Sequence, residues 1–475
     1  MLRRFRAPAE HRGRDSSSRD RTTAAAVVME SVEGRFLFST FTVVSTNDSG
    51  AGSLRQAILD ANKTTAVDTI KFSIGSGAKT IAPKTALPGI SQPTILDATT
   101  QPGFAGKPLI ELSGASAGHI DGLKLTGTGI TVKGLIVNRF GGSGIFIWGK
   151  GGNKIIGCWI GTDKTGSAAA GNKANGIIVQ SPNNTIGGTS ASDRNVLSGN
   201  GTAGVLYYLA AASNNKILGN YVGTDCTGSK AVANHNGIQI NGATNVTVGG
   251  TAAGSRNIIS GNTRDGVLMV TGGTHDNTVQ GNYIGTNAGG NAKIPNKWYG
   301  VEISQPHNLV GGTVTGARNV ISGNGMDGVV FYLLTGNNNR CEGNFLGTDA
   351  SGTRDLGNTG AGACATNGAN NNVIGGSTSA SRNIIAGNDL CGVGIYNGAN
   401  ANKVMNNYIG VSCSGCTLTN TKQGVFILSS SNTVVQSNRI ALSGAYSAVQ
   451  TLSGSGTVQS SNSLYANVAA GLRVV

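Results

Sequence analysis

Four arginines recur at a nearly constant interval and could bind a polymer of carboxylates. Each opens the phrase Arg-Asn-[Val/Ile]-[Leu/Ile]-[Ser/Ala]-Gly-Asn, and successive copies start 62, 62 and 64 residues apart, at Arg194, Arg256, Arg318 and Arg382. A guanidinium binds a carboxylate through two parallel hydrogen bonds, so such a row suits an acidic glycan. Because the row keeps the period of the whole chain, we favour a structural role, in which the arginines bond turn carbonyls or neighbouring Asp loops.

An acidic row accompanies the arginines. The phrase Gly-[Thr/Val]-[Asp/Asn/Ser] begins in steps of 62, 62, 62 and 63 residues, at Gly161, Gly223, Gly285, Gly347 and Gly410. Its third position is Asp163, Asp225 and Asp349 in three copies, and Asn287 takes that place in another. A structural role of the arginines would use these loops as partners.

Aromatic side chains at outward strand positions are the second candidate binding group. We predict one column made of Trp148, Tyr208, Tyr332 and Tyr396, which is broken at Val270. The polar residues on intervening strands include Gln180, Gln239 and Glu302. Rings that alternate with amides suit the apolar faces and hydroxyls of sugars, and an exposed apolar stripe marks a contact surface. Two alternatives stay open: long loops cover this face, or the aromatics are present because they favour strands.

Catalytic signatures are weaker than binding signatures. Hydrolysis of a glycosidic bond needs two carboxyl groups about 5–9.5 Å apart, and Glu302 is expected to stand alone on its strand face. Asp265 and Asp327 are equivalent residues, but Ala203 and Cys391 fill that position elsewhere, so we interpret both as turn residues. We therefore assign no catalytic residue, and a composite site built from loops stays open.

No metal and no cofactor are expected. The segment Cys413-Ser-Gly-Cys416 has the CxxC spacing, but it has no second pair and no nearby His. A local disulfide and plain turn residues both remain open for this pair. His119, His235, His275 and His307 fall in unrelated positions of the repeat. The glycine-aspartate nonapeptide that binds calcium is absent.

The fixed period itself predicts the fold. Repeats of about sixty residues that recur along a chain form an elongated array, whose units bury their apolar faces by stacking. Glycine accounts for 75 of 475 residues, and only 12% are charged, which favours short strands and tight turns over long helices. Each repeat contains two strands of the form Gly-apolar-x-apolar. We therefore predict an all-β, right-handed parallel β-helix with two coils in each repeat.

Alternation within these strands predicts which side chains point inward. They are Ile145 and Ile147, Val205 and Tyr207, Ile238 and Ile240, Val301 and Ile303, and Val329 and Phe331. Asparagines after the strands are expected to form hydrogen-bonded ladders between coils. The first set is Asn153, Asn184, Asn215, Asn245, Asn277, Asn308, Asn339, Asn372, Asn402 and Asn432. The second set is Asn200, Asn220, Asn262, Asn282, Asn324, Asn344 and Asn388.

The positive charge is too diffuse for a nucleic-acid protein. The formal net charge is +14, of which residues 1–28 carry +4, so +10 is spread over the rest. Nucleic-acid proteins concentrate Lys and Arg on one face, so an acidic polysaccharide or an anionic cell envelope is the favoured partner. No stretch is long enough for a transmembrane helix. The oligomeric state stays open.

The N-terminal part shows two resemblances. Residues 30–39 resemble the LEPR-XLL motif of exported bacterial proteins, although Gly34 and Arg35 depart from it. Residues 42–62, with 68–72 and 101–112, resemble the N-terminal cap of bacterial CSLREA-type parallel β-helix repeat proteins. This second resemblance, with the repeats, covers roughly residues 41–450. It implies the β-helix fold, and the first implies export. The segment 53–62 has helical spacing with Ser53 as N-cap, and is predicted to close the first coil.

We divide the chain into three parts: a basic, disordered or targeting segment at 1–40, a cap with the first coils at 41–118, and β-helix repeats at 119–475. The leading hypothesis is a non-catalytic, secreted or cell-surface adhesive or matrix-associated protein that binds polysaccharide on an exposed strand face. The first alternative is a polysaccharide lyase, glycoside hydrolase or uronan epimerase. Its mark would be Asp or Glu that converge with Arg, Lys or His outside the period of the repeat. The second alternative is a purely structural spacer without a ligand.

Overall fold

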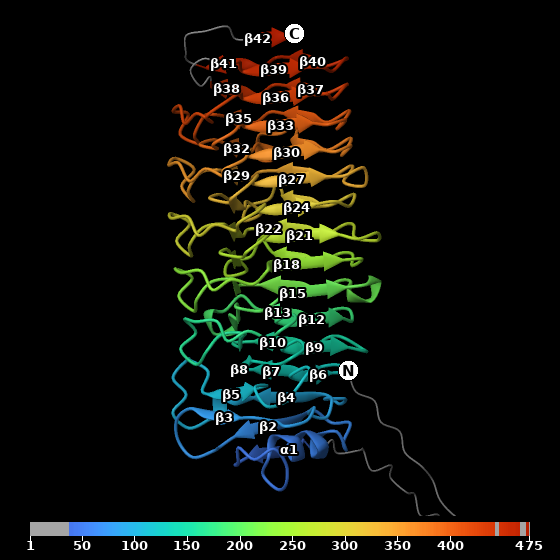
Figure 1. Cartoon of the computed structure of the whole chain (residues 1–475), viewed down its shortest axis with the longest axis vertical. Coiled ribbons are helices and arrows are strands. Elements are labelled where there is room, and N and C mark those ends of the chain that lie inside the picture. Colours follow the sequence, from blue (N-terminus) through green and yellow to red (C-terminus); the bar gives the residue numbers. More distant parts are fainter. Residues whose placement is uncertain (1–37, 442–445, 466–471, 475) are drawn as a thin grey trace, which may run out of the picture. The chain divides into compact units, whose positions relative to one another are not determined.

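The computed structural model describes residues 38–441, 446–465 and 472–474. The unit that begins at Phe38 is a stack of coils built from three sheets, in which every pair of neighbouring strands is parallel. Figure 1 shows the strands stacked one above another along the molecule's long axis. The predicted parallel β-helix is therefore confirmed. The basic segment and most of the export-like motif fall outside the described residues.

Sheet A consists of β1 (Thr40–Val43), β2 (Asp68–Phe72), β4 (Thr94–Asp97), β7 (Thr131–Lys133), β10 (Lys154–Ile156), β13 (Thr185–Gly187), β16 (Lys216–Leu218), β19 (Thr247–Gly249), β22 (Thr278–Gln280), β25 (Leu309–Gly311), β28 (Arg340–Glu342), β31 (Val373–Gly375), β34 (Lys403–Met405), β37 (Val434–Gln436) and β40 (Val458–Ser460).

Sheet B consists of β3 (Lys79–Ile81), β5 (Ile110–Ser113), β8 (Leu135–Asn138), β11 (Trp159–Ile160), β14 (Val196–Leu197), β17 (Tyr221–Val222), β20 (Ile258–Ile259), β23 (Tyr283–Ile284), β26 (Val320–Ile321), β29 (Phe345–Leu346), β32 (Ile384–Ile385), β35 (Tyr408–Ile409), β38 (Arg439–Ala441) and β41 (Ser463–Tyr465).

Sheet C consists of β6 (Leu123–Leu125), β9 (Ile145–Trp148), β12 (Ile177–Gln180), β15 (Ala203–Tyr208), β18 (Asn236–Asn241), β21 (Val267–Val270), β24 (Val301–Ile303), β27 (Val329–Tyr332), β30 (Ala363–Thr366), β33 (Val393–Tyr396), β36 (Val425–Leu428), β39 (Val449–Leu452) and β42 (Leu472–Val474). Short 3₁₀ helices lie at Ala98–Thr100, Ala191–Asp193, Ala210–Ala212 and Ser379–Ser381.

The interior is filled by the side chains that alternation points inward. All ten predicted inward residues are completely buried, and they belong to one continuous hydrophobic core. Consecutive strands of each sheet place like residues over like, as where Ile145 pairs with Ile177 and Ile177 with Val205. Each buried aliphatic side chain contributes roughly 1.5–3 kcal/mol, so stability is distributed along the stack.

Buried asparagines hold the turns in three ladders: two directly precede the strands of sheets A and B, and the third lies in the turn between sheets B and C. In each ladder the side-chain oxygen of one asparagine accepts a hydrogen bond from the backbone N–H of its counterpart one coil earlier: Asn153 N–H donates to Asn184 Oδ1, and Asn195 N–H donates to Asn220 Oδ1. The ladders are confirmed, with one correction. Asn245 and Asn432 lie one residue before their rungs, in left-handed backbone conformation, and Val246 and Thr433 take the rung positions.

The N-terminal end of the core is covered by helix α1 (Leu54–Ala61). The hydroxyl of Ser53 accepts a hydrogen bond from the backbone N–H of Gln56 at 3.2 Å, which is the predicted N-cap. Leu54 and Ile58 on the apolar face of α1 join the core of the coils. In the described part of the chain, no helix has the length and apolar character that a membrane span requires.

Candidate functional site

The outer face of sheet C presents two parallel columns of side chains. Strand register aligns them from coil to coil. The first column is Phe146, Ile178, Leu206, Gln239, Leu268, Glu302, Val330, Cys364, Gly394, Phe426 and Gln450. The second column is Trp148, Gln180, Tyr208, Asn241, Val270, Tyr332, Thr366, Tyr396 and Leu428.

Two exposed aromatic rings flank an amide in the second column. Trp148 on β9 is 56% exposed and Tyr208 on β15 is 37% exposed, and the half-buried Gln180 on β12 lies between them. Because neighbouring strands are about 4.8 Å apart, the backbones that carry the two rings are separated by about 9.6 Å. We call these three residues the Trp148 patch. It presents two apolar rings with a hydrogen-bonding amide between them.

The predicted aromatic column is not continuous beyond this patch. Gln239 and Glu302 lie in the first column and not between the rings. Tyr332 and Tyr396 belong to the second column but are half-buried. The ring of Tyr396 leans over Gly394, where there is no side chain in its way, and its hydroxyl lies 3.0 Å from the Cys391 sulfur. The column, predicted to be broken at Val270, was therefore wrong in the exposure of its C-terminal members, Tyr332 and Tyr396.

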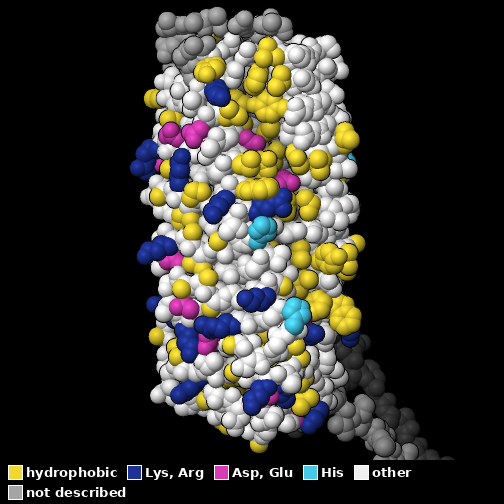
Figure 2. All heavy atoms as spheres, in the orientation of Figure 1, with side chains coloured by type: hydrophobic (Ala, Val, Ile, Leu, Met, Phe, Trp, Pro, Cys, Tyr) yellow, Lys and Arg dark blue, Asp and Glu magenta, His cyan; other side chains and the backbone are white. Residues whose placement is uncertain are grey.

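Near β33 and β36, the same face has a hollow of about 430 Å³. The ring of Tyr396 meets Phe426 edge to face, with ring centres 5.7 Å apart. Gln423 donates to the Gln450 side chain at 2.6 Å beside these rings. The lining residues are Leu390, Tyr396, Asn397, Lys422, Gln423, Phe426, Leu428 and Tyr446. Hydrophobic side chains gather on this face toward the C-terminal end of the stack (Figure 2).

Glu302 does not stand alone, which corrects the expectation from the sequence. Asp265, just before β21, lies near it, and Arg264 reaches both: its Nε is 3.3 Å from Asp265 Oδ2 and its Nη2 is 3.9 Å from Glu302 Oε2. The guanidinium carbon of Arg264 also lies 4.6 Å from the ring centre of Trp298. We call Arg264, Asp265 and Glu302 the acid cluster. Arg264 and Glu302 occur in one repeat only, and Asp327, the counterpart of Asp265, lacks both partners, so periodicity gave no signal for the cluster.

Burial shifts the acid cluster toward its protonated forms. Asp265 is 0% exposed and Glu302 is 5% exposed. Burial, together with the nearby Glu302 charge, raises the pKa of Asp265 to about 7. Burial also raises the pKa of Glu302. The interpretation of Asp265 as a turn residue still holds in part, because its Oδ1 accepts a hydrogen bond from the backbone N–H of Tyr299 at 3.1 Å.

The arginine row lies at the turns between sheets A and B. Each guanidinium stacks on an aromatic ring of the following coil, with distances of 4.1 to 4.4 Å from its carbon to the ring centre. The pairs are Arg194 with Tyr221, Arg256 with Tyr283, Arg318 with Phe345, and Arg382 with Tyr408. Each Nε also donates to a turn carbonyl at 3.2 Å. The predicted hydrogen bonds from the arginines to turn carbonyls are therefore confirmed, whereas the stacking on aromatic rings was not predicted.

The Asp loops do not pair with these arginines. Asp225 instead closes its own loop, because its Oδ1 accepts from the backbone N–H groups of Ser229 at 2.9 Å and Lys230 at 3.2 Å. Burial alone would raise the pKa of Asp225, but hydrogen bonds from Thr227 and these N–H groups lower it overall. Asp163 and Asp349 are held in the same way.

A recurring aromatic column on sheet B was missed. In every long repeat an aromatic residue stands two positions before the glycine of the Gly-[Thr/Val] phrase. These residues are Trp159, Tyr221, Tyr283, Phe345 and Tyr408. Their rings pack against small residues of the loops, such as Ala288 and Ala350. The spacing was visible in the sequence, but the arginine partner lies in a preceding coil, which local alternation cannot reveal.

Among the described residues, the cysteines and histidines form no metal-binding cluster. All seven cysteines are free, including Cys413 and Cys416. The thiol of Cys413 donates to the Ser351 carbonyl at 2.9 Å. Within residues 38–441, 446–465 and 472–474, no three His, Cys, Asp or Glu side chains are grouped so that they could hold a metal ion.

Comparison with known proteins finds solved structures of low sequence identity. No protein-family model matches the chain, and no curated protein matches its sequence. The A-module of mannuronan C-5 epimerase AlgE6 from Azotobacter vinelandii is 13% identical, with 90% of this chain and 100% of that one covered and a TM-score of 0.48. The AlgE4 A-module of the same organism is 14% identical, with 92% of this chain and 99% of that one covered and a TM-score of 0.37. The periplasmic alginate epimerase AlgG is 11% identical, with 85% of this chain and 78% of that one covered and a TM-score of 0.43.

Proposed function

We propose that this chain is a non-catalytic protein that holds a polysaccharide against the outer face of sheet C. The Trp148 patch is the observation that carries the proposal, because it exposes two rings in register with an amide between them. The hollow beside Tyr396 and Phe426 supports a second contact further along the same sheet.

The physical basis is complementarity between a flat sheet and an extended polymer. A sugar ring has an apolar face that packs on an indole or phenol, and hydroxyls at its edge that bond an amide. The Trp148 patch and the hollow beside Tyr396 lie on the same sheet, so weak contacts at the two places add up over a long ligand. The backbone beneath is held by the asparagine ladders, so little ordering is needed on binding.

A comparison of exposed tryptophans tests the proposal. Affinity electrophoresis on a panel of neutral and acidic glycans should show retardation of the wild type, and its loss in the Trp148→Ala/Tyr208→Ala variant. Trp298→Ala is the matched control: Trp298 is 44% exposed, but its ring stacks with Arg264. Equal retardation of the wild type and the double variant by every glycan that retards the wild type would remove the assignment.

The acid cluster favours the alternative, a polysaccharide lyase, glycoside hydrolase or epimerase. Two carboxyl groups converge there with an arginine, outside the period of the repeat. Both carboxyl groups are buried, so a polymer that lies on the sheet does not reach them in this arrangement. We therefore place binding first. Reducing-end and unsaturated-uronate assays on the same glycan panel decide: product formation that Glu302→Gln abolishes would favour the enzyme.

We propose an extracellular or cell-surface location as an adhesive or matrix-associated protein. The resemblance of residues 30–39 to an export motif supports this location, as do the diffuse positive charge and the ligand proposed above. Protease treatment of intact cells tests it. Loss of the full-length chain without lysis is expected, and protection until lysis would contradict it.

A further inference from the structure

We propose that the arginine row is a second binding surface, which holds a linear acidic polysaccharide by its carboxylates along the corner between sheets A and B. This surface is distinct from sheet C. Each arginine lies between a strand of sheet A and the next strand of sheet B, as Arg256 does between β19 and β20.

Stacking fixes the guanidinium groups but leaves their ends available. The ring covers one face and the turn carbonyl takes the Nε hydrogen, as seen for Arg256 over Tyr283 with Gly281. Among the described residues, no carboxylate pairs with Arg194, Arg256 or Arg318. Arg382 differs, because its Nη2 donates to the Asn406 side chain at 2.9 Å. Three arginines thus offer a pair of parallel Nη donors, which matches the two oxygens of a carboxylate.

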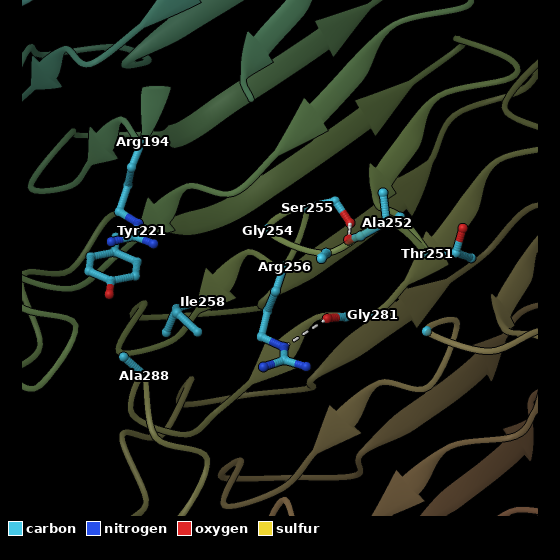
Figure 3. A pocket seen from close by; sticks show the side chains of 13 residues that line it. Arg194, Tyr221, Thr251, Ala252, Gly254, Ser255, Arg256, Ile258, Gly281 and Ala288 are labelled. Carbon is cyan, nitrogen blue, oxygen red and sulfur yellow. Dashed lines mark hydrogen bonds between the residues drawn. The ribbon is translucent and has the colours of Figure 1, made fainter. Parts of the chain in front are cut away.

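Hollows follow one another beside these arginines. One of about 450 Å³ is lined by Arg194, Arg256 and the loop at residues 250–255. In Figure 3, Arg194 and Arg256 extend in the same direction from successive repeats, with Arg194 over the ring of Tyr221 and the loop beside them. A hollow of about 300 Å³ at Arg318 shares Gly316 with the first, and another of about 480 Å³ shares Arg194. The hollows therefore adjoin along the corner.

The surroundings of the arginines fit a polymer that carries both carboxylates and hydroxyls. Lys107, Lys133 and Asp193 line the hollow at the N-terminal end of the row, and Lys133 also pairs with Asp97 at 3.5 Å, so Lys107 is the cation that this end adds. In the central hollow, the exposed Thr251 presents a hydroxyl, and its loop presents backbone groups, for hydrogen bonds to a ligand. A charged polysaccharide presents carboxylates for the arginines and hydroxyls for the loop. The chain's net charge of +14 attracts any anionic ligand, so it does not distinguish a polysaccharide from other anions.

The spacing of the row argues for a polysaccharide over a nucleic acid. Successive arginines are two coils apart, which places their backbones about 9.6 Å from each other. In a duplex the phosphates of one strand follow at about 3.4 Å of helix axis, so a row aligned with that axis would meet only about every third phosphate. The rings of sheet B are already covered by the arginines and loops, so they are not available to stack bases.

Binding of polygalacturonate to the full chain at about 0.15 M salt, where nonspecific charge attraction is screened, tests the proposal. Arg256→Gln/Arg318→Gln should weaken binding on the order of a hundredfold, from about tenfold for each charge-assisted contact. The matched control is Lys216→Gln/Lys403→Gln, which removes the same charge from exposed positions on sheet A. That control should change affinity by no more than about threefold.

Further variants separate this surface from sheet C and from misfolding. Arg256→Lys/Arg318→Lys keeps the charge but loses the planar pair of donors, and an intermediate loss is expected with unchanged circular dichroism. Trp148→Ala/Tyr208→Ala should leave polygalacturonate binding intact. Three results would each overturn the proposal. One is an equal loss of polygalacturonate affinity in Arg256→Gln/Arg318→Gln and in the control Lys216→Gln/Lys403→Gln. The others are arginine-dependent binding of single-stranded DNA that is tighter than that of polygalacturonate, and no binding of polygalacturonate. Loss in the Trp148 variant alone would overturn it while the function proposed for sheet C stands.

Discussion

The guanidinium carbon of Arg256 lies 4.1 Å from the ring centre of Tyr283, which belongs to the next coil. The Nε of this arginine also donates to the Gly281 carbonyl of that coil. The same ring packs against Ala288 and Ala350 of the loops. This arrangement recurs through the stack, so each arginine ties a turn to the coil after it, and the loops pack on the remaining surface of the ring.

The loop glycine beside this ring should be intolerant of a side chain. Gly290 has a φ of +65°, and a Cβ there would come 2.6 Å from Tyr283 and 2.7 Å from Ala350. Gly290→Ala should destabilise the fold by about 1–3 kcal/mol, because it adds left-handed strain to steric overlap. The neighbour Gly289 meets only the Asn291 side chain, at 3.2 Å. Gly289→Ala should change the urea midpoint little, and equal effects of both variants would contradict the packing.

The asparagine ladders should be far more sensitive than surface asparagines. The Asn282 side chain accepts from the Asn257 side chain at 2.9 Å and donates to the Val248 carbonyl at 2.9 Å, in the interior. Asn282→Ala leaves buried partners unsatisfied, which should cost about 2–4 kcal/mol in the free energy of unfolding. The exposed Asn291 provides the control, and its change to alanine should cost within about 0.5 kcal/mol. Similar urea unfolding curves for the two variants would disprove a structural ladder.

Sequence periodicity predicted the repeated features because each is enforced in every coil. The inward positions, such as Ile145 and Phe331, follow from strict alternation over a closed core. The predicted ladder position was one residue too early at Asn245, because asparagine is common both at the rung and at the residue before it. Only the left-handed backbone conformation of the earlier residue distinguishes the two positions. A register error of one residue is the typical failure of a pattern with period two.

Features that do not recur from repeat to repeat could not be predicted from the period of the sequence. Asp265 and Glu302 are 37 residues apart in sequence, and only the pairing of β21 with β24 brings them near each other. The orientation of Tyr396 depends on the missing side chain of Gly394 and on the Cys391 sulfur. Outward aromatic residues can be recognised in the sequence, but whether they stand free or fold onto the strand depends on these particular neighbours.

The acid cluster should make the protein less stable as pH rises toward neutrality. The pKa of Asp265 is raised from 3.8 to about 7 by burial and by Glu302, so the folded state binds more protons than the unfolded state between these values. Folding stability should therefore fall as pH increases through this window, by up to about 4 kcal/mol, and level off above it. Asp265→Asn should flatten the dependence of Tm on pH between 4 and 7.

A loop aspartate supplies the control of opposite sign for this pH dependence. Burial would raise the pKa of Asp163, but hydrogen bonds from Thr165 and the backbone N–H groups of Ser167 and Ala168 lower it overall. Its contribution to stability is present above the ordinary pKa of 3.8 and is lost as pH falls through the folded value. Asp163→Asn should leave the slope between pH 4 and 7 unchanged. A wild-type Tm that rises from pH 4 to pH 7 would contradict a buried, protonated Asp265.

The fluorescence of Trp148 during titration with glycans tests the function proposed for sheet C most directly. The chain has three tryptophans, so Trp159→Phe/Trp298→Phe leaves Trp148 as the only one. A neutral glycan that retards the wild type in affinity electrophoresis should shift the emission of Trp148 to shorter wavelength in a saturable way, because a sugar ring displaces water from the exposed indole. Retardation by that neutral glycan with unchanged Trp148 emission would show that it binds elsewhere and would contradict the proposal.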